Sequence, residues 1–300
     1  MKLSVIIVNY NVAGDVDICL SSISRVLKGI DYEIIVIDNN STDRDIEKVS
    51  EKHKGIRFEF LKDNIGFGAA NNYGAGISRG EYILLLNPDT IVTEDFINPI
   101  IDFIEKNNEA GACGPMLKYP DGRYQYSCGP QMGLLYETAE ALMFIKLFRY
   151  IFRRFYLNRY ADNPVKVGWL SAACMIIKKD VFTKTGGFDK DYFLNYEDID
   201  LCRKINEMGL ENYYFPAYSC IHSDHSSQKK NYEVLVFSRY QSRRIFSRKY
   251  YGFFKRLCIN MIHLSGIILR LAVTGIMYKN TERKQRMKGY IKSLKLYTGV

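Results

Sequence analysis

The sequence has no paired-cysteine motif. Its seven cysteines, at positions 19, 113, 128, 174, 202, 220 and 258, include no C-x-x-C pair, and their number is odd. A small secreted domain held by disulfides uses an even set of cysteines, and a zinc ribbon needs C-x-x-C pairs. We therefore exclude both classes and expect a chain with reduced thiols in the cytoplasm.

The sequence also lacks the features of a signal peptide. The apolar stretch at the N-terminus covers only residues 3–8 before Asn9, and no small-residue cleavage site follows it. A secretory signal has a longer apolar region and such a site. Residues 3–8 are therefore predicted to be a first strand. The length of 300 residues suits one large α/β domain with an appendage.

Acidic residues are scarce near the C-terminus. Residues 221–300 hold 17 Lys and Arg but only 3 Asp and Glu, a balance of +14. The net charge of the whole chain is +9, so residues 1–220 carry −5. A basic tail on an acidic body implies an anionic partner for the tail, such as lipid headgroups, phosphates or nucleic acid.

Short strand-like runs alternate with helix-like segments in the first third of the chain. The runs cover residues 3–8, 33–37, 57–61 and 82–86. This order predicts an α/β fold with a mainly parallel central sheet. Three of the runs are followed by a polar residue, namely Asn9, Asp38 and Asn87. Such sheets bind ligands at the carboxyl ends of their strands, so these residues are predicted to line a crevice.

Residues 87–90 (Asn-Pro-Asp-Thr) follow the run at 82–86. Proline has no N–H to give to a strand ladder, so Pro88 is expected to end the strand. Asp89 then stands at the carboxyl end of a central strand, where a carboxylate can bind a divalent cation and, through it, a diphosphate. The alternative is an ordinary turn that caps the next helix.

Residues 63–72 follow the strand at 57–61 and contain two glycines. Gly66 and Gly68 permit close approach of a ligand to the backbone, and the helix that follows offers free N–H groups to a phosphate. A dinucleotide site is not indicated, because the third glycine of G-x-G-x-x-G is missing. An ordinary loop-to-helix entry is the alternative. Earlier in the chain, Ser41 or Thr42 is predicted to cap a helix beginning near residue 43.

Carboxylates and imidazoles gather in the second half of the chain. Glu197 and Asp198 stand at the start of a predicted helix, where the helix dipole keeps them ionised. They can serve as bases, or they can simply complement that dipole. His222 and His225 follow a predicted strand, and near a carboxylate site they are candidate metal ligands. The only tryptophan, Trp169, can stack on a sugar or belong to the core.

Two further stretches are rich in apolar and basic residues. Residues 133–160 interleave aromatics with arginines, which favours an amphipathic helix covering the core over a helix that binds nucleic acid or a membrane. Residues 257–277 are long and apolar enough to span a membrane, but they include an asparagine, a histidine and an arginine. We therefore expect this helix to lie in the membrane interface or to fold on the body.

Several of these motifs, in this order, resemble the family 2 glycosyltransferases. They span about residues 3–227, and their combination is more specific than any one of them. The stretch 168–202 is most similar to the bacterial rhamnosyltransferase branch and is close also to galactofuranosyltransferases. The matching motifs are residues 9–11, 38–41, 64–72, 87–90, 187–189 and 196–200, with the histidine of 222–227.

The resemblance implies a GT-A fold, a nucleoside-diphosphate sugar donor, a divalent metal ion (Mn²⁺ or Mg²⁺) and inversion at the anomeric carbon. By motif position, Asp89 looks like the metal-binding carboxylate of the family's DXD element. His222 falls where the family has its histidine ligand, and the spacing to Ser227 agrees. Asn87 replaces the first acid of that element with a neutral oxygen donor, which weakens the metal site or leaves it water-bridged.

The resemblance also implies where the donor binds. Asp38 and Asn39 are expected to hold its base and ribose, helped by the backbone near Val8 and Asn9. The residues expected to contact the donor are Val8, Asn9, Asn11, Asp38, Asn39, Asn64, Gly66, Phe67, Gly68, Asn71, Asn87 and Trp169.

A single displacement fits these residues. Asp198 is expected to take the proton from the acceptor hydroxyl, and Glu197 is the alternative base. The first choice of donor is dTDP-L-rhamnose, and a UDP-linked galactofuranose, N-acetylglucosamine or other hexose is the alternative. The expected acceptor is a hydroxyl of a glycan or of a polyprenyl-linked glycan in cell-surface polysaccharide synthesis.

The expected organisation is a GT-A domain over residues 1–227 and a basic, partly apolar helical extension over 228–300. This arrangement favours a cytoplasmic enzyme that is peripheral on the inner face of the cell membrane. An inactive membrane-associated scaffold is the alternative from another class. Nucleic-acid binding is not expected, because acids at positions 38, 89 and 198 would repel phosphate near the same crevice.

Overall fold

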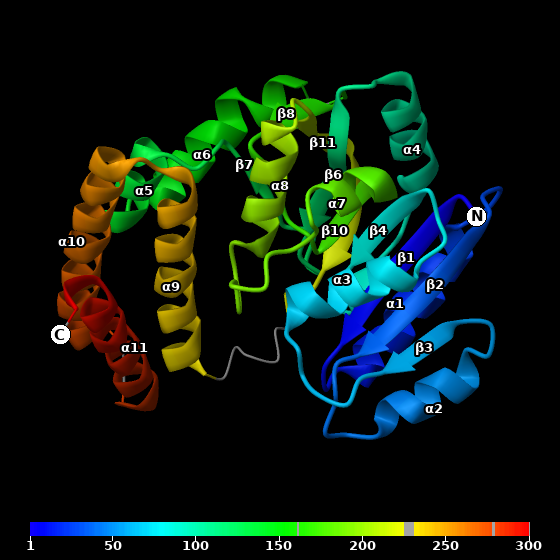
Figure 1. Ribbon diagram of the computed structural model, residues 1–300, viewed down its shortest axis with the longest axis horizontal. Helices are drawn as coiled ribbons and strands as arrows, with labels where there is room; N and C mark the ends of the chain where they lie inside the picture. The colour runs from blue at the N-terminus through cyan, green and yellow to red at the C-terminus, as the bar shows by residue number, and fades with distance from the viewer. Residues whose placement is uncertain (161, 225–230, 278–279, 300) are drawn as a thin grey trace. The chain divides into compact units, whose positions relative to one another are not determined.

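The computed structural model describes residues 1–160, 162–224, 231–277 and 280–299 (Figure 1). The chain forms two compact units. Unit 1 comprises Met1–Gln131, Leu157–Lys190 and Glu197–His225, and unit 2 comprises Met132–Tyr156, Asp191–Tyr196 and Ser226–Val300. The predicted boundary between residues 227 and 228 lies outside the described residues and stays a prediction.

A mixed sheet forms the centre of unit 1. Its strands in spatial order are β3 (Arg57–Phe60), β2 (Tyr32–Asp38), β1 (Leu3–Asn9), β4 (Tyr82–Leu86), β10 (Cys174–Lys178), β6 (Ala110–Lys118), β11 (Glu211–His222) and β5 (Thr90–Ile91), with β8 (Val165–Val167) paired to β11. The four strands from β3 to β4 are parallel, β10 is antiparallel to both neighbours, and β6 is parallel to β11. The predicted α/β class is confirmed.

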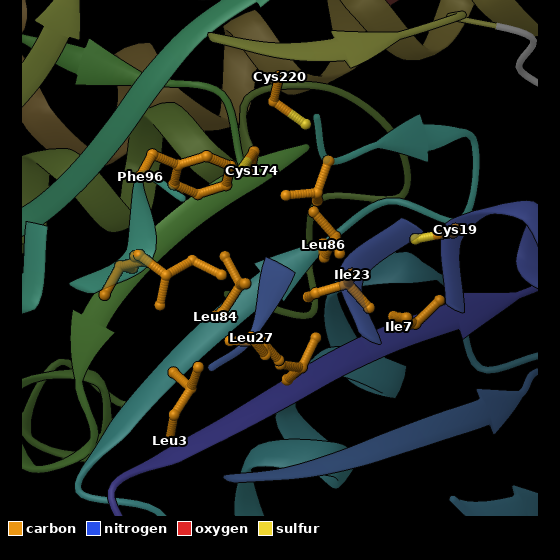
Figure 2. Packing of buried hydrophobic residues seen from close by; sticks show 14 of the residues in the cluster. Leu3, Ile7, Cys19, Ile23, Leu27, Leu84, Leu86, Phe96, Cys174 and Cys220 are labelled. Atoms are coloured by element: carbon orange, nitrogen blue, oxygen red, sulfur yellow. The ribbon is translucent and has the colours of Figure 1, made fainter. Parts of the chain in front are cut away.

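The continuous apolar runs explain why β1 and β4 lie at the centre of the sheet. Every residue of both strands is buried, as expected for strands covered on both faces. On one face, Leu3, Ile7 and Leu84 pack with Ile23 of α1, together with the buried thiols of Cys19, Cys174 and Cys220 (Figure 2).

The remaining elements of unit 1 are α1 (Ala13–Val26), α2 (Asp45–Lys52), α3 (Phe67–Ile77), α4 (Ile97–Lys106), β7 (Cys128–Gly129), a 3-10 turn (Leu157–Tyr160), β9 (Trp169–Leu170), α7 (Lys179–Lys184) and α8 (Glu197–Glu207).

The predicted cap of the second helix is wrong. α2 starts at Asp45, its N-cap position is Arg44, and no side chain caps it. The Ser41 hydroxyl instead donates to Oδ1 of Asp38, 2.6 Å away, and the Thr42 hydroxyl donates to Asn11. Both acceptor positions of the Ser41 hydroxyl are taken by Asn9 Nδ2 and the Asn11 N–H, so this hydroxyl does not accept from an N–H of α2.

Unit 2 is helical. Its elements are α5 (Leu134–Ala141), α6 (Ile145–Phe155), α9 (Tyr232–Tyr250), α10 (Phe253–Met277) and α11 (Asn280–Thr298). Its core is a small cluster of Val236, Tyr240, Ile267 and Tyr290 from α9, α10 and α11. The helical extension predicted from the sequence is confirmed, and the helix predicted over residues 257–277 begins four residues earlier, at Phe253.

The role predicted for the aromatic and basic stretch is wrong for its second helix, α6, whereas α5 buries part of its surface. An amphipathic helix covering the core was expected within residues 133–160, but no residue of α6 is buried. The apolar residues recur with a helical period, as expected. However, only part of the apolar face of α6 packs against the rest of unit 2. Phe148 packs edge-on against Tyr136 of α5, with ring centroids 5.7 Å apart.

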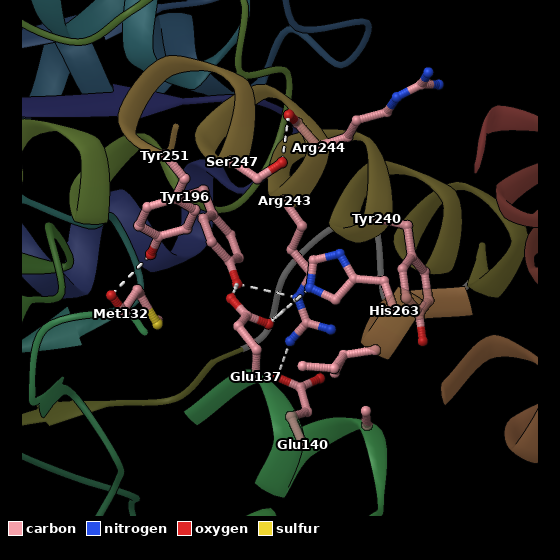
Figure 3. A network of polar contacts seen from close by, with 12 residues as sticks. Met132, Glu137, Glu140, Tyr196, Tyr240, Arg243, Arg244, Ser247, Tyr251 and His263 are labelled. Atoms are coloured by element: carbon pink, nitrogen blue, oxygen red, sulfur yellow. Dashed lines mark hydrogen bonds and ion pairs between the residues drawn. The ribbon is translucent and has the colours of Figure 1, made fainter. Parts of the chain in front are cut away.

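A buried polar network ties the helices of unit 2 together (Figure 3). Glu137 of α5 accepts from His263 of α10, with Oε2 and Nε2 2.9 Å apart. Arg243 of α9 forms an ion pair with Glu140 and donates through Nε to the Tyr196 hydroxyl, 3.0 Å away. Burial opposes the charge on Glu137, but Arg243 and His263 together hold the pKa of this carboxyl below its usual value.

Candidate active site

Polar side chains meet at the carboxyl ends of β1 and β2. Asn9 and Asp38 are register partners on the two strands, and Asn9 Nδ2 donates to Asp38 Oδ1 across 2.7 Å. The Ser41 N–H donates to Asp38 Oδ2 at 3.1 Å, and Asn9 Nδ2 also donates to the Ser41 hydroxyl. The parallel register thus places both predicted donor-binding residues at one edge of the sheet.

The loops after these strands join the same cluster. Asn39 Nδ2 donates to Asn64 Oδ1 over 2.9 Å, and Asn39 Oδ1 accepts from the Ile65 N–H over the same distance. Asn11 has a positive φ of 58° and accepts from the Thr42 N–H. The structure therefore brings together Asn9, Asn11, Asp38, Asn39 and Asn64, which come from three separate loops.

Other residues predicted to bind the donor lie in the packing around α3. Val8 and Phe67 belong to an apolar cluster with Ile35, Ile37 and Ala70. Asn71 donates to the Phe67 carbonyl within its own helix. A Cβ at Gly68 would stand 3.0 Å from Cβ of Phe188, whereas Gly66 has a φ of +86° and open space around its Cα. These contacts hold α3 against the sheet, and direct donor contacts by these residues stay predictions.

Asp89, His222 and Asn87 lie side by side at the end of β4. Asp89 Oδ1 is 3.2 Å from His222 Nε2, and Asn87 Nδ2 is also 3.2 Å from that nitrogen. Thr90 of β5 pairs with His222 of β11, which brings the two segments together. His225 and Ser227, the other residues of the predicted histidine motif, lie outside the described residues.

Gln125 orients the His222 ring, a role that no pattern in the sequence indicates. Its Oε1 lies 2.8 Å from His222 Nδ1, and both side chains are buried. A carboxamide oxygen only accepts hydrogen bonds, so Nδ1 carries a proton, and in the neutral ring Nε2 then presents a lone pair. Nε2 therefore faces Asp89 and Asn87 as an acceptor.

The cluster offers acceptor atoms to a cation. Two acceptors at 3.2 Å, Asp89 Oδ1 and His222 Nε2, repel each other unless they share a proton or a metal ion. Among the described residues, none hydrogen-bonds the buried Oδ1 of Asn87. Within the same part of the chain, no three His, Cys, Asp or Glu side chains are placed to hold a metal. A cation here would therefore have two such ligands and a neutral amide oxygen beside them.

Glu197 and Asp198 open α8 as the predicted carboxylate pair. Burial raises the pKa of Asp198 to about 6, although the N–H groups of Ile199 and Ala172 favour its charged form. Burial and the neighbouring charge of Asp198 raise the pKa of Glu197 to about 8. At neutral pH, Asp198 is the ionised member of the pair and Glu197 retains its proton, so the expectation that the helix dipole keeps both ionised is wrong for Glu197, where burial outweighs the dipole.

A short segment before β10 connects this pair to the end of β4. The Ala172 N–H interacts with the Asp198 carboxylate, and the Ala173 carbonyl accepts from the Asn87 N–H over 2.9 Å. Antiparallel pairing of Cys174 with Leu86 fixes the register of this segment. Two adjacent residues of one loop therefore contact the two segments: Ala172 contacts Asp198, and Ala173 contacts Asn87.

Trp169 is buried beside this loop. Its ring packs edge-on against Tyr126, with centroids 5.5 Å apart, and Gly129 lies against its indole nitrogen. Stacking of the ring on a sugar stays a prediction. A separate cavity of about 700 Å³ is lined by Arg79–Tyr82, Lys178–Asp180 and Thr183–Lys184, at the amino end of β4. None of the predicted site residues lines that cavity.

The sequence matches a known family and known proteins. The family described as "Glycosyl transferase family 2" matches residues 4–186. The N-acetylglucosaminyl-diphospho-decaprenol L-rhamnosyltransferase of Mycobacterium tuberculosis is 24% identical over 309 residues, covering 99% of this chain and 98% of that protein. Rhamnosyltransferase WbbL of Escherichia coli K12 is 25% identical over 221 residues, covering 66% of this chain and 75% of that protein.

A solved structure supports the fold. The mannosyltransferase PcManGT from Pyrobaculum calidifontis, in complex with GDP-Man and Mn²⁺, superposes with a TM-score of 0.59 at 16% identity. The superposition covers 98% of this chain and 86% of that one. The GT-A fold predicted from the sequence is confirmed by this likeness.

Proposed function

Since the chain belongs to glycosyl transferase family 2, we propose that it transfers L-rhamnose, with inversion, from dTDP-L-rhamnose to a hydroxyl of a lipid-linked glycan. The choice of rhamnose is supported by the names of two relatives, the rhamnosyltransferases of M. tuberculosis and E. coli. The lipid-linked acceptor is supported by the decaprenol in the name of the first. A UDP-hexose is the alternative donor.

One observation carries this proposal, namely the facing acceptors of Asp89 and His222 beside the buried oxygen of Asn87. Their chemistry fits a divalent cation such as Mn²⁺ or Mg²⁺, because it offers carboxylate, imidazole and amide atoms together. Such a cation, when bound, would neutralise the charge of the departing diphosphate. Asn87 in place of an acid makes the protein's own share of the site less negative.

Asp198 is proposed as the general base. The acceptor oxygen attacks the anomeric carbon, its proton passes to the Asp198 carboxylate, and the bond from that carbon to the diphosphate breaks. Glu197, which keeps its proton at neutral pH, avoids a second negative charge beside Asp198. Glu197 is the alternative base.

The nucleotide is proposed to bind over the polar cluster at the ends of β1 and β2. Asp38 and Asn39 would hold the base and ribose, with Asn9, Asn11 and Asn64 keeping these side chains in place. The hydrogen bonds among these residues hold their side chains in place, and a site whose side chains are held in place costs less to order on binding.

We propose that the enzyme acts at the cytoplasmic face of the membrane, in cell-surface polysaccharide synthesis, because the proposed acceptor is lipid-linked. Among the described residues, one helix, α10, contains a stretch (Phe253–Ile276) that is long and apolar enough to cross a membrane. We propose a peripheral attachment because Arg270 and His263 of this helix have partners in unit 2. An inactive scaffold is the alternative hypothesis, because Asn87 stands where an acid is expected.

A transfer assay tests the proposal. The purified chain is incubated with dTDP-L-rhamnose, a polyprenyl-diphosphate-linked N-acetylglucosamine acceptor and Mn²⁺ or Mg²⁺, and release of dTDP is measured. Rhamnosylated product is expected, with little product from UDP-hexoses. No turnover with any nucleotide sugar and either metal would favour the scaffold.

We predict that Gln125→Leu weakens Mn²⁺ binding by about 10- to 100-fold, the usual effect of losing a group that orients a metal-binding histidine. Leucine cannot accept the proton of Nδ1, so the ring of His222 loses its fixed tautomer. Calorimetric titration with Mn²⁺ in the presence of dTDP measures the effect. Gln131→Leu, an exposed amide of the same unit, is the matched control. Equal Mn²⁺ affinity in both variants would contradict the assignment.

We also predict an acid limb in the pH profile. Asp198 acts as a base only when ionised, so kcat/KM is expected to fall about tenfold for each pH unit below the pKa of about 6. The profile is measured at saturating metal between pH 4.5 and 9 by following dTDP release, and kcat/KM is determined at intervals of about half a pH unit. A limb near pH 8 instead would identify Glu197, whose pKa is raised to about 8, as the base.

A further inference from the structure

An uncharged stripe runs along the exposed side of α10. The exposed residues between positions 257 and 276 are Leu257, Cys258, Met261, Ser265, Ile268, Leu269, Ala272 and Ile276. Ile276 is 86% exposed, and Met261 and Ile268 are each 56% exposed. Steps of three and four residues keep most of them on one helical face, about 30 Å long. An apolar face of this length on a folded chain indicates an interaction surface.

The opposite side of α10 is committed to unit 2. Ile259, His263 and Ile267 are buried, and His263 bonds to Glu137 of α5. Arg270 donates through Nη1 to the Ala141 carbonyl, 3.1 Å away. The polar residues that argue against a membrane span are therefore turned towards protein. A helix with one protein-facing side and one apolar side suits the plane of an interface.

α6 exposes a second apolar face in the same unit. Leu147, Ile151 and Phe155 follow one another at steps of four residues and are 56%, 46% and 69% exposed. The other side of the helix carries basic residues, including Lys146 and Arg153. Both α6 and α10 pack against α5. An exposed apolar face beside basic residues is the pattern of helices that lie at a membrane surface.

We propose that these two faces form a membrane-docking surface for a bilayer containing anionic lipid. The docking surface comprises Leu257, Met261, Ile268 and Ile276 of α10 and Leu147, Ile151 and Phe155 of α6. It inserts its apolar side chains among the lipid headgroups and acyl boundary, and its basic residues contact anionic headgroups. This inference rests on the proposed function only in that a lipid-linked acceptor gives the docking its purpose.

Charge favours lipid over a second copy of the chain. Residues 221–300 carry a balance of +14, and α6 adds Lys146, Arg149, Arg153 and Arg154 without an acid. Two copies meeting through this surface would bring like charges together, whereas an anionic bilayer complements them. At the start of α10, Phe253 and Phe254 precede Lys255 and Arg256, and the two aromatic rings are exposed. Aromatic and basic residues together are typical of the membrane interface.

Vesicle flotation of the full chain tests the docking surface. The vesicles contain phosphatidylglycerol and phosphatidylcholine, or phosphatidylcholine alone. One variant combines Met261→Ser, Ile268→Ser and Ile276→Ser, and another combines Leu147→Ser, Ile151→Ser and Phe155→Ser. The matched control combines Ile18→Ser and Phe60→Ser, two exposed apolar residues of unit 1. Circular dichroism checks that each variant remains folded.

The unmodified chain and the control are expected to float with the anionic vesicles and much less with the neutral ones. Each docking variant is expected to lose about tenfold or more of the floated fraction. Flotation of both variants at the unmodified level would overturn the proposal. So would a chain that stays at the bottom of the gradient but sediments as a dimer that the variants dissociate.

Transfer to a water-soluble acceptor separates this inference from the proposed function. The docking residues lie outside the candidate site, so the variants are expected to keep the transfer rate of the unmodified chain. Flotation without transfer would leave the docking surface standing and remove the glycosyltransferase proposal. Transfer without flotation would do the reverse.

Discussion

Replacing Asp198 with asparagine is expected to lower turnover by about 10²- to 10⁴-fold, the usual contribution of a general base. Asparagine keeps an oxygen that can accept from the N–H groups of Ile199 and Ala172, so the start of α8 should keep its geometry. It cannot take a proton from the acceptor hydroxyl. Initial rates of dTDP release measure the loss, and calorimetry with dTDP and Mn²⁺ should show unchanged donor-site affinity.

Glu197→Gln is the matched variant for this experiment. It removes a carboxyl group one residue away that holds its proton at neutral pH, so its turnover is expected to fall much less than that of Asp198→Asn. The reverse order of the two effects would assign the base to Glu197. A loss of dTDP affinity equal to the loss of turnover would instead mean that Asp198 shapes the donor site.

The central strands could be predicted from the sequence because their signal is local. In β1 before Asn9, and throughout β4, every residue is apolar or small, and each run is followed by a turn, so burial on both faces follows from the residues themselves. The polar ends, Asn9, Asp38 and Asn87, then fall at one edge of the sheet because parallel strands share a direction. This part of the site needed no knowledge of distant contacts.

The approach of His222 to Asn87 has no local signal. The two residues are 135 positions apart, and their contact depends on β5 pairing with β11. Resemblance to a family supplied His222 as a candidate, since family motifs hold information about distant partners. Gln125 had no such help, because it belongs to none of the motifs and reaches His222 across 97 positions.

The errors at Ser41 and α6 have the same physical origin. Ser41 is a residue type that caps helices, but its hydroxyl accepts from Asn9 and the Asn11 N–H and donates to Asp38 instead. The apolar residues of α6 recur with the period of an amphipathic helix. This period indicates that the helix has an apolar face, but it does not indicate what covers that face. In both cases the residue type or its period was interpreted correctly, but the groups that Ser41 and α6 contact depend on the tertiary fold.

Arg243→Leu is expected to destabilise unit 2 by about 3–5 kcal/mol, the usual cost of removing one partner from a buried ion pair. The arginine is 3% exposed and pairs with Glu140 and Glu137, so its loss leaves two carboxylates buried in α5. Arg239→Leu, an exposed arginine of the same helix, is the control and should cost little. Trp169 belongs to unit 1, so its fluorescence does not report on unit 2 directly. Hydrogen exchange of peptides from α5, α9 and α10 measures the stability of unit 2 directly.

The pH dependence of this stability follows from two lowered pKa values. Arg243 and His263 hold the pKa of Glu137 below its ordinary value of 4.5 despite burial, and burial lowers the pKa of His263 below its ordinary value of 6.5. A group whose pKa is lower in the folded state stabilises the fold above its ordinary pKa and loses that contribution as pH falls. Exchange protection in unit 2 should therefore begin to fall below about pH 6.5 and fall further below about pH 4.5. In Arg243→Leu the pKa of Glu137 rises, so the lower step should weaken or reverse. A variant that keeps both steps would show that Arg243 does not stabilise the charge of Glu137.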